Sequence, residues 1–270
     1  MEQCYSFIQN KRMNQMSMMG TSVRFGKEQT FGEEWRKIVE IEDREERNQE
    51  IDKLLENYQS NSTQNGFWGQ NDIVQITFGA GASNSIMLDD KSLYYLFFDV
   101  LKENLDKNKA LENPKNEGLI VVNSIYATIN MYFGKYNGNL DLRDRLTSFD
   151  FEQEKMPSVA VLKGKGCAAC VEKASVSHNL FLLTGRESYF VSSCSSKFEH
   201  SNDQGHSFTF IKNSKGNFML FDHAMQNFGM VEGDPIEAML NGEPLVIGEP
   251  FANQGVYANA CNLELENTAQ

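Results

Sequence analysis

Apolar residues recur at helical spacing in three stretches of the first half of the chain. The first stretch covers residues 33–58 and is interrupted by a charged run at residues 42–50, which we interpret as a solvated helical stretch or a break between two helices. The second follows Asp90, a suitable helix N-cap, and the third ends at Gly134. These positions predict a helical N-terminal part over about residues 31–150. The apolar positions are Trp35, Ile38, Val39, Ile51, Leu54, Leu55 and Tyr58, then Leu93, Leu96, Phe97, Val100, Leu101 and Leu105, then Leu119, Val122, Ile125, Tyr126, Ile129, Tyr132 and Phe133.

The second half of the chain has shorter apolar runs with a different period. Residues 159–162 are mainly β-branched and predict a strand, whereas residues 171–183 predict a buried helix that ends near Gly185. Residues 206–211 and 218–222 predict two strands, with a five-residue hairpin loop at 212–216 between them. A turn at 227–229, a short helix at 235–240 and a strand at 245–247 follow. Residues 155–260 are therefore expected to form an α+β core.

The two predicted strands place a histidine and a carboxylate on matching faces. His206, Phe208 and Phe210 share one face by period two, and Phe218 and Asp222 share a face of the next strand. If residue 211 pairs with residue 217, His206 lies directly opposite Asp222. Cross-strand Cβ atoms are then about 4.5–5.5 Å apart, which is close enough for an imidazole–carboxylate hydrogen bond.

The termini and the remaining linkers look less regular. Residues 1–30 are polar and methionine-rich, and we expect a flexible arm there, with a tail at 261–270. Residues 57–66 are expected to form a polar loop. The glycines at 79 and 81 lack the lysine of a phosphate-binding loop, so this stretch predicts a plain loop and no cofactor site.

Charge and cysteine usage narrow the class of protein. The formal net charge of the 270-residue chain is −12, which argues against a nucleic-acid partner or an anionic membrane. No segment predicts a membrane span or a secretory signal. The five cysteines, at 4, 167, 170, 194 and 261, lack the spacing of a disulfide framework. We therefore expect a cytoplasmic protein, and the sequence does not indicate its oligomeric state.

Three residues form a candidate reactive site in the second half. Cys170 lies near the start of the predicted buried helix, where the helix dipole and free N–H groups favour a negative sulfur or an oxyanion. A thiol becomes a good nucleophile when a nearby base takes its proton, and His206, oriented by Asp222, would serve as that base. The order of these residues therefore predicts a Cys-His-Asp site without a metal or cofactor.

The same segment resembles a known family over about residues 158–225. The resemblance is carried by Gly164-Lys-Gly166, Cys170-Val-Glu-Lys-Ala174, the segments 179–185 and 188–192, Gly205-His206 and Phe221-Asp222. Together these are similar to the core of the transglutaminase-like superfamily of papain-like cysteine hydrolases.

This resemblance implies a papain-like core, in which a central helix packs against an antiparallel sheet, and an acyl-transfer reaction through a thioester. Cys170 would be the nucleophile, His206 the base and Asp222 the orienting group. The substrates would be peptide or side-chain amides of proteins, with peptidase or amidase activity expected first and transglutaminase-type transfer second. Cys170 is preferred over Cys167 because Glu172 and Ala174 follow it at the family spacing.

Other readings of the same residues stay open. Cys167 and Cys170 form a C-x-x-C pair, which also fits a redox site, or a zinc site completed by Cys194 and either His200 or His206. A transglutaminase-like domain without catalytic activity, used for binding, is a further alternative. Elsewhere, we expect His178 to be a core residue, His223 to point away from Asp222, His200 to lie on a polar loop at the rim of the site, and Glu172 to compensate the helix dipole.

Overall fold

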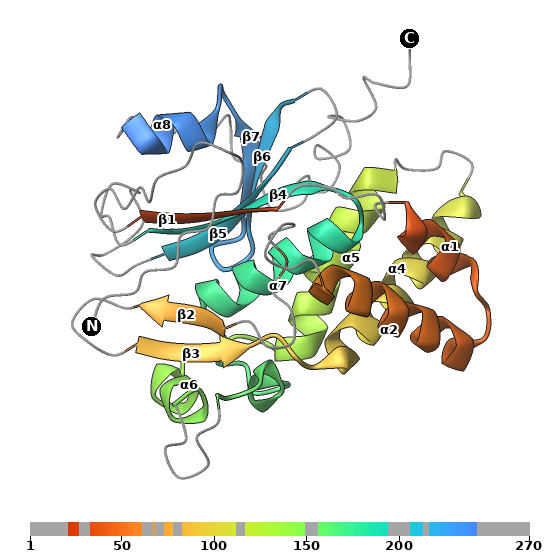
Figure 1. Ribbon diagram of the computed structural model, residues 1–270, viewed down its shortest axis with the longest axis horizontal. Coiled ribbons are helices and arrows are strands. Elements are labelled where there is room, and N and C mark those ends of the chain that lie inside the picture. Colours follow the sequence, from red (N-terminus) through yellow and green to blue (C-terminus); the bar gives the residue numbers. More distant parts are fainter. Residues whose placement is uncertain are drawn as a thin grey trace.

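The protein has an α+β fold with a five-stranded antiparallel sheet, a separate two-stranded sheet, and helices that lie mostly on one side of the larger sheet (Figure 1). The computed structural model describes residues 21–26, 33–60, 67, 73–77, 83–111, 117–148, 156–193, 206–212 and 216–241. The elements in chain order are β1 (Thr21–Gly26), α1 (Glu34–Glu40), α2 (Arg44–Ser60), β2 (Ile73–Thr77), β3 (Ser83–Met87), α4 (Lys91–Lys109), α5 (Glu117–Phe133), α6 (Leu140–Leu146), the 3-10 helix η1 (Val159–Leu162), α7 (Cys170–Leu183), β4 (Glu187–Ser193), β5 (His206–Lys212), β6 (Phe218–Asp222), β7 (Asn227–Val231) and α8 (Pro235–Asn241).

The main sheet separates two apolar layers. Its strands follow the order β1-β4-β5-β6-β7, and each neighbouring pair is antiparallel. Helix α7 packs along β4 and β5, and α5 packs against α7 (Figure 1). The other face carries a smaller apolar cluster that includes Phe208, Phe210 and Leu220 and is contacted by Ile236 of α8. The sheet is thus covered on both faces, with the larger core on the side of α7.

Helix α7 is buried from Val171 to Leu183. Three of its polar side chains form hydrogen bonds inside the protein: the Ser175 and Ser177 hydroxyls donate to the carbonyl groups four residues earlier, and Asn179 donates to the Tyr94 hydroxyl. The helix ends before Gly185, whose φ of +73° fits the left-handed conformation common after a helix C-terminus. The sequence prediction of a buried helix ending near Gly185 is confirmed.

The helices expected between residues 31 and 150 are present. The predicted apolar stripes are largely buried in α1, α2, α4 and α5, and the Asp90 carboxylate accepts a hydrogen bond from the Ser92 N–H at the start of α4. This part also contains the antiparallel pair β2–β3, which the sequence analysis did not predict. Helix α2 runs to Ser60, so it extends into the region expected to be a loop.

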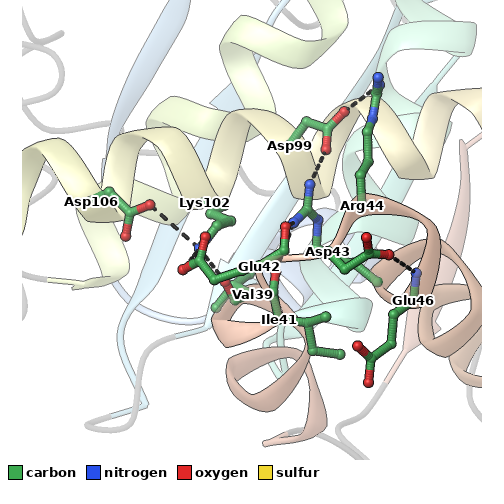
Figure 2. A network of polar contacts seen from close by, with 10 residues as sticks. Val39, Ile41, Glu42, Asp43, Arg44, Glu46, Asp99, Lys102 and Asp106 are labelled. Carbon is green, nitrogen blue, oxygen red and sulfur yellow. Dashed lines mark hydrogen bonds and ion pairs between the residues drawn. The ribbon is translucent and has the colours of Figure 1, made fainter.

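The charged run at residues 42–50 joins three helices. The Asp99 carboxylate of α4 accepts hydrogen bonds from two arginines of α2, Arg44 at 2.6 Å and Arg47 at 2.7 Å. Figure 2 shows Arg44 extending towards Asp99. Lys102 of α4 donates to the Val39 carbonyl of α1 and to Glu42. The chain breaks between α1 and α2 at residues 41–43 and is helical again from residue 44. The run is therefore a helix break followed by a helix that fixes α1 and α2 to α4.

Two predicted elements differ in the structure. Residues 159–162 form the 3-10 helix η1 and not a strand. The Ser158 hydroxyl accepts the Ala160 N–H, and Val159 and Leu162, three residues apart, both turn into the core. The predicted turn at 227–229 is strand β7, with Gly229 opposite Leu220. The reversal occurs at residues 223–226 instead, where Gln226 adopts a φ of +54°.

The expectation of a flexible arm does not hold for residues 21–26. These residues form β1 and pair with β4 from Thr21–Ser193 to Gly26–Ser188. Backbone pairing of this kind covers an edge that β4 would otherwise leave open. The rest of the arm, the loop at 79–81, the strand expected at 245–247 and the tail at 261–270 lie outside the described residues.

Candidate active site

Cys170 is the first residue of α7, and its thiol is free and partly exposed. The preceding residue, Ala169, has no side chain able to cap the helix. Glu172 caps the helix instead, because its Oε2 atom accepts a hydrogen bond from the Ala169 N–H at 2.9 Å. The backbone N–H groups of the first turn of a helix have no partners within the helix, and the helix dipole favours negative charge at this end.

Glu172 is itself held by an arginine from α6. The Arg143 Nε atom donates to Glu172 Oε1 at 2.7 Å, and the exposed fractions of the two side chains are 1% and 0%. Glu172 compensates the helix dipole as expected, but it is fully buried and paired. Removing either partner would leave a buried charge alone, so this pair fixes the start of α7 relative to α6.

A glycine turn places the chain just ahead of Cys170. The Gly166 N–H donates to the Phe133 carbonyl at 2.7 Å, and the Asn137 N–H donates to the Gly166 carbonyl at 2.8 Å. Gly166 has a φ of +65°, and a Cβ atom there would lie 2.2 Å from the Lys135 carbonyl oxygen. Only glycine fits this close approach, which ties the segment before Cys170 to the end of α5.

His206 and Asp222 meet at the same end of the sheet. His206 begins β5 and Asp222 ends β6, and His206 Nε2 lies 2.6 Å from Asp222 Oδ2. The second oxygen of Asp222 accepts the Met225 N–H at 3.1 Å, which orients the carboxylate. Strand β5 is tied to α7 because the Thr209 hydroxyl donates to the Ala174 carbonyl at 3.1 Å. Cys170 is one turn before Ala174, so this bond also sets the position of His206 relative to the thiol.

The predicted pairing register is wrong by two residues. The ladder joins Thr209 to Phe221 and Lys212 to Phe218, and it does not place His206 opposite Asp222. Since side chains alternate with period two, a shift of two residues keeps both on the same face of the sheet. They are diagonal neighbours, which a long side chain such as histidine can bridge. The hydrogen bond between His206 and Asp222 therefore forms, although the two residues are not paired directly in the ladder.

The electrostatics of the site favour a protonated His206. Burial lowers the pKa of the imidazole, but its interactions with the Asp222 carboxylate and the Cys170 side chain outweigh this effect and raise the pKa to about 10. The ring therefore interacts with both of the other candidate residues. The structure joins His206 to Asp222 by a hydrogen bond, and the pKa of His206 responds to the Cys170 side chain.

The two thiols of the C-x-x-C pair differ in their surroundings. Cys167 is fully buried, and burial raises the pKa of its thiol. The thiol is therefore protonated and inaccessible to solvent. Cys170 is partly exposed at the helix start and interacts with His206. The difference favours Cys170 as the reacting thiol.

The other histidines have separate roles. His178 is fully buried and its Nδ1 atom lies 2.9 Å from the Ser188 hydroxyl, as expected for a core residue. His223 stacks on Tyr126 of α5 with ring centroids 4.5 Å apart. Burial, followed by the charge of Lys173, lowers the pKa of His223 to about 3, so this ring is neutral and is not a second acid. His200 lies outside the described residues.

The alternative metal site has no support within the described residues. No group of three or more His, Cys, Asp and Glu side chains in this part of the chain has the arrangement of a metal site. Two of the residues considered as zinc ligands, Cys194 and His200, lie outside it. Both described cysteines are free thiols.

No helix in the described ranges has both the length and the apolar character needed to cross a bilayer.

Two charged residues near Cys170, Arg143 and Lys173, were not predicted from the sequence. Arg143 lies 29 positions before its partner Glu172 in a short polar helix, and nothing in the local pattern links the two. Lys173, next to Glu172 in the sequence, is also buried, with an exposed fraction of 8%. A signal was available for Lys173: it lies three positions after Cys170 on a helix whose other positions are mostly apolar or small.

Comparison with known proteins leaves the family open: no protein-family model matches the chain, and searches of curated proteins and of solved structures find no match.

Proposed function

We propose that the protein is a cysteine-dependent acyl-transfer enzyme that acts on peptide or side-chain amides of proteins. The observation that carries this proposal is the position of His206, whose ring is bonded to Asp222 at 2.6 Å and interacts with the Cys170 thiol. A thiol, an imidazole and an orienting carboxylate in this order are the parts needed for nucleophilic catalysis at a carbonyl.

The arrangement of the core supports a papain-like, transglutaminase-like architecture. A central helix with the nucleophile at its first residue packs against an antiparallel sheet that carries the base and the carboxylate on adjacent strands. The family assignment rests on this arrangement together with the motifs around Cys170. A reducing compartment such as the cytoplasm is proposed because the reaction requires a free thiol.

The first half of the reaction forms a thioester. Asp222 occupies His206 Nε2, so Nδ1 is the atom that holds the proton taken from the Cys170 thiol, and the resting enzyme contains a thiolate beside a protonated imidazole. The thiolate then attacks the amide carbonyl carbon, and the carbonyl oxygen becomes an oxyanion near the N–H groups at the start of α7. When the C–N bond breaks, the leaving amine takes the proton from His206, and the acyl group remains on the Cys170 sulfur.

The second half returns the enzyme to its starting state. His206 accepts a proton from the incoming nucleophile, which attacks the thioester carbonyl. The C–S bond breaks, and the Cys170 sulfur leaves as a thiolate beside the protonated His206. Water as the nucleophile gives a carboxylic acid, and a primary amine gives a new amide. We place hydrolysis first, with transglutaminase-type transfer as the second outcome of the same chemistry.

The test is an assay that reports acyl donor and acceptor together. Labelled peptides, glutamine-containing proteins and small amides are each incubated with the full chain in water alone and with an excess of a labelled primary amine. Acid release is followed by chromatography and amine incorporation by mass spectrometry. We expect turnover of at least one amide class and a trapped acyl group on Cys170 in intact-protein spectra.

Two alanine variants provide the comparison. Cys170→Ala should abolish both turnover and acylation, whereas Cys167→Ala, the matched change at the buried thiol, should retain both if it folds. Turnover that survives in Cys170→Ala would contradict the assignment of the nucleophile. An absence of turnover combined with an unreactive Cys170 thiol would instead favour a non-catalytic binding domain.

A further inference from the structure

Lys173 places an ammonium group inside the candidate site. It lies three residues after Cys170 on α7, a spacing that puts both side chains on one side of the helix. Its exposed fraction is 8%, and its Nζ atom is 4.9 Å from the centroid of the Tyr136 ring, which covers it from the loop between α5 and α6. Lysine is seldom buried to this extent unless its charge is compensated.

The nearby carboxylates are engaged elsewhere. Glu172 is paired with Arg143 and caps the helix through the Ala169 N–H. Asp222 accepts hydrogen bonds from His206 and from the Met225 N–H. Among the residues that the structure describes, no carboxylate lies within ion-pair distance of Lys173. Its charge therefore lacks a dedicated carboxylate partner.

The electrostatic surroundings of Lys173 point to the sulfur of Cys170. Burial lowers the pKa of the ammonium group, and the charges that oppose this effect are those of Cys170, Glu172 and Asp222, with Cys170 the largest of them. On the side of the sheet, His223 is the remaining titratable neighbour, and it is kept neutral. The Cys170 sulfur, which shares one side of α7 with Lys173, is therefore the group on which the Lys173 charge is placed to act.

We propose that Lys173 is a positioning residue whose fixed positive charge stabilises the Cys170 thiolate, in addition to the imidazolium of His206. The inference rests on the proposed function, because it assigns a second electrostatic contribution to the same thiol. The two contributions differ in origin. The positive charge of His206 depends on the protonation of its ring, which Asp222 favours. The positive charge of Lys173 belongs to a side chain on α7, the same helix that carries Cys170.

The test measures the alkylation rate of Cys170 at pH 7 by mass mapping. Lys173→Met keeps the length and apolar stem of the side chain and removes the charge. Its Cys170 should react about tenfold more slowly with iodoacetamide, the change expected for loss of one nearby opposite charge. Lys173→Arg should recover most of the rate. Lys212→Met is the matched control, because Lys212 also lies over an aromatic ring, 5.1 Å from the Phe218 centroid, but at the opposite end of β5 from His206.

The charge of the reagent gives a second readout that a purely structural role would not change. Iodoacetate is anionic and iodoacetamide is neutral, so a cation beside the sulfur raises the rate of the first relative to the second. This ratio should fall in Lys173→Met and stay at the parent value in Lys212→Met. Equal rates and equal ratios in the folded parent and in folded Lys173→Met would overturn the inference.

A third variant keeps the inference testable if Lys173→Met does not fold. His206→Gln removes the imidazolium and leaves Lys173 in place, so the iodoacetate to iodoacetamide ratio at Cys170 should still exceed that of a cysteine in a short peptide. A ratio equal to that of the peptide would overturn the inference. Failure of the proposed function has a different signature, since Cys170 would then react no faster than Cys167 in the parent itself.

Discussion

His206 Nε2 lies 2.6 Å from Asp222 Oδ2 beyond the point where the backbone ladder between β5 and β6 ends at Thr209 and Phe221. Asp222 is instead paired through its backbone with Asn227 of β7, and His206 with Ser193 of β4. Side chains rather than backbone groups therefore connect the two strands at the site. A bond of this kind can orient the imidazole without fixing the distance between the two main chains.

Asp222→Asn should slow the alkylation of Cys170 near neutral pH while the protein stays folded. The substitution keeps the shape of the side chain and removes the charge that favours the imidazolium of His206, so the thiolate loses part of its stabilisation. We expect a loss of about 1–3 kcal/mol, seen as a slower rate with iodoacetamide. Asp234→Asn is the control, because Asp234 is an exposed cap of α8. Identical Cys170 rates in the two variants would exclude the Asp222 carboxylate from the site.

The pKa of His206 should be measurable by NMR. Its interactions with Asp222 and Cys170 raise the pKa to about 10, although burial alone would lower it. The ring should therefore remain protonated at pH 8, and its C–H resonances should titrate near pH 10. His223, with a pKa lowered to about 3, should not titrate between pH 5 and 11. A His206 midpoint near 6.5, the value of a free imidazole, would contradict the coupling.

The same shift has a consequence for stability. A pKa raised above its unfolded value means that the folded state binds the proton more tightly, so His206 stabilises the fold fully below about pH 6.5. This contribution should be lost as the pH rises towards 10. In Asp222→Asn the pKa of His206 should move down, and the loss should occur at lower pH. Denaturant unfolding across this range provides the measurement.

Gly166→Ala should destabilise the protein by about 2–4 kcal/mol. The added Cβ atom would meet the Lys135 carbonyl oxygen at 2.2 Å, and the residue would have to hold a φ of +65°. Gly164→Ala is the matched control: its φ is +68°, but a Cβ atom there meets nothing within 4 Å. That variant should lose only about 1–2 kcal/mol, the strain of the left-handed conformation alone. Comparable losses in both, measured by denaturant unfolding, would mean that the close approach is unimportant.

Arg143→Met should be strongly destabilising because it leaves the Glu172 carboxylate buried without its partner. The expected loss in the free energy of unfolding is about 3–5 kcal/mol. Replacing both residues, as Arg143→Met with Glu172→Met, should recover part of this loss, since no lone charge then remains. Arg145→Met, on the exposed side of the same helix, should be close to neutral. A loss below 1 kcal/mol in Arg143→Met, in a full double-mutant cycle, would show that the pair is not coupled.

Local pattern was sufficient for much of this site and for most of the helices. Cys170 at a helix start and His206 and Asp222 at the ends of strands follow from period and from turn residues, and the apolar stripes of α4 and α5 follow from helical spacing. The contact between His206 and Asp222 was predicted correctly although the predicted register was wrong. A shift of two residues leaves each side chain on the same face of its strand.

The parts that pattern did not predict depend on long-range contacts or on local turns. Arg143 and Glu172 lie 29 positions apart, and no motif or periodicity around either residue indicates that the two form an ion pair. The run at 159–162 has strand composition, but the Ser158 hydroxyl and the burial of Val159 and Leu162 favour a tight turn. Gly229 suggested a turn, whereas it lies inside a strand and Gln226 takes the left-handed position.

The central claim is that Cys170 is an activated nucleophile, and its selective alkylation in the parent protein is the most direct test. The full chain is treated briefly with iodoacetamide at pH 7, quenched and mapped by mass spectrometry. Because Cys170 is partly exposed beside His206 and Cys167 is buried, Cys170 should be labelled at least about tenfold faster. Equal labelling of the two thiols, or preferential labelling of Cys167, would contradict the account.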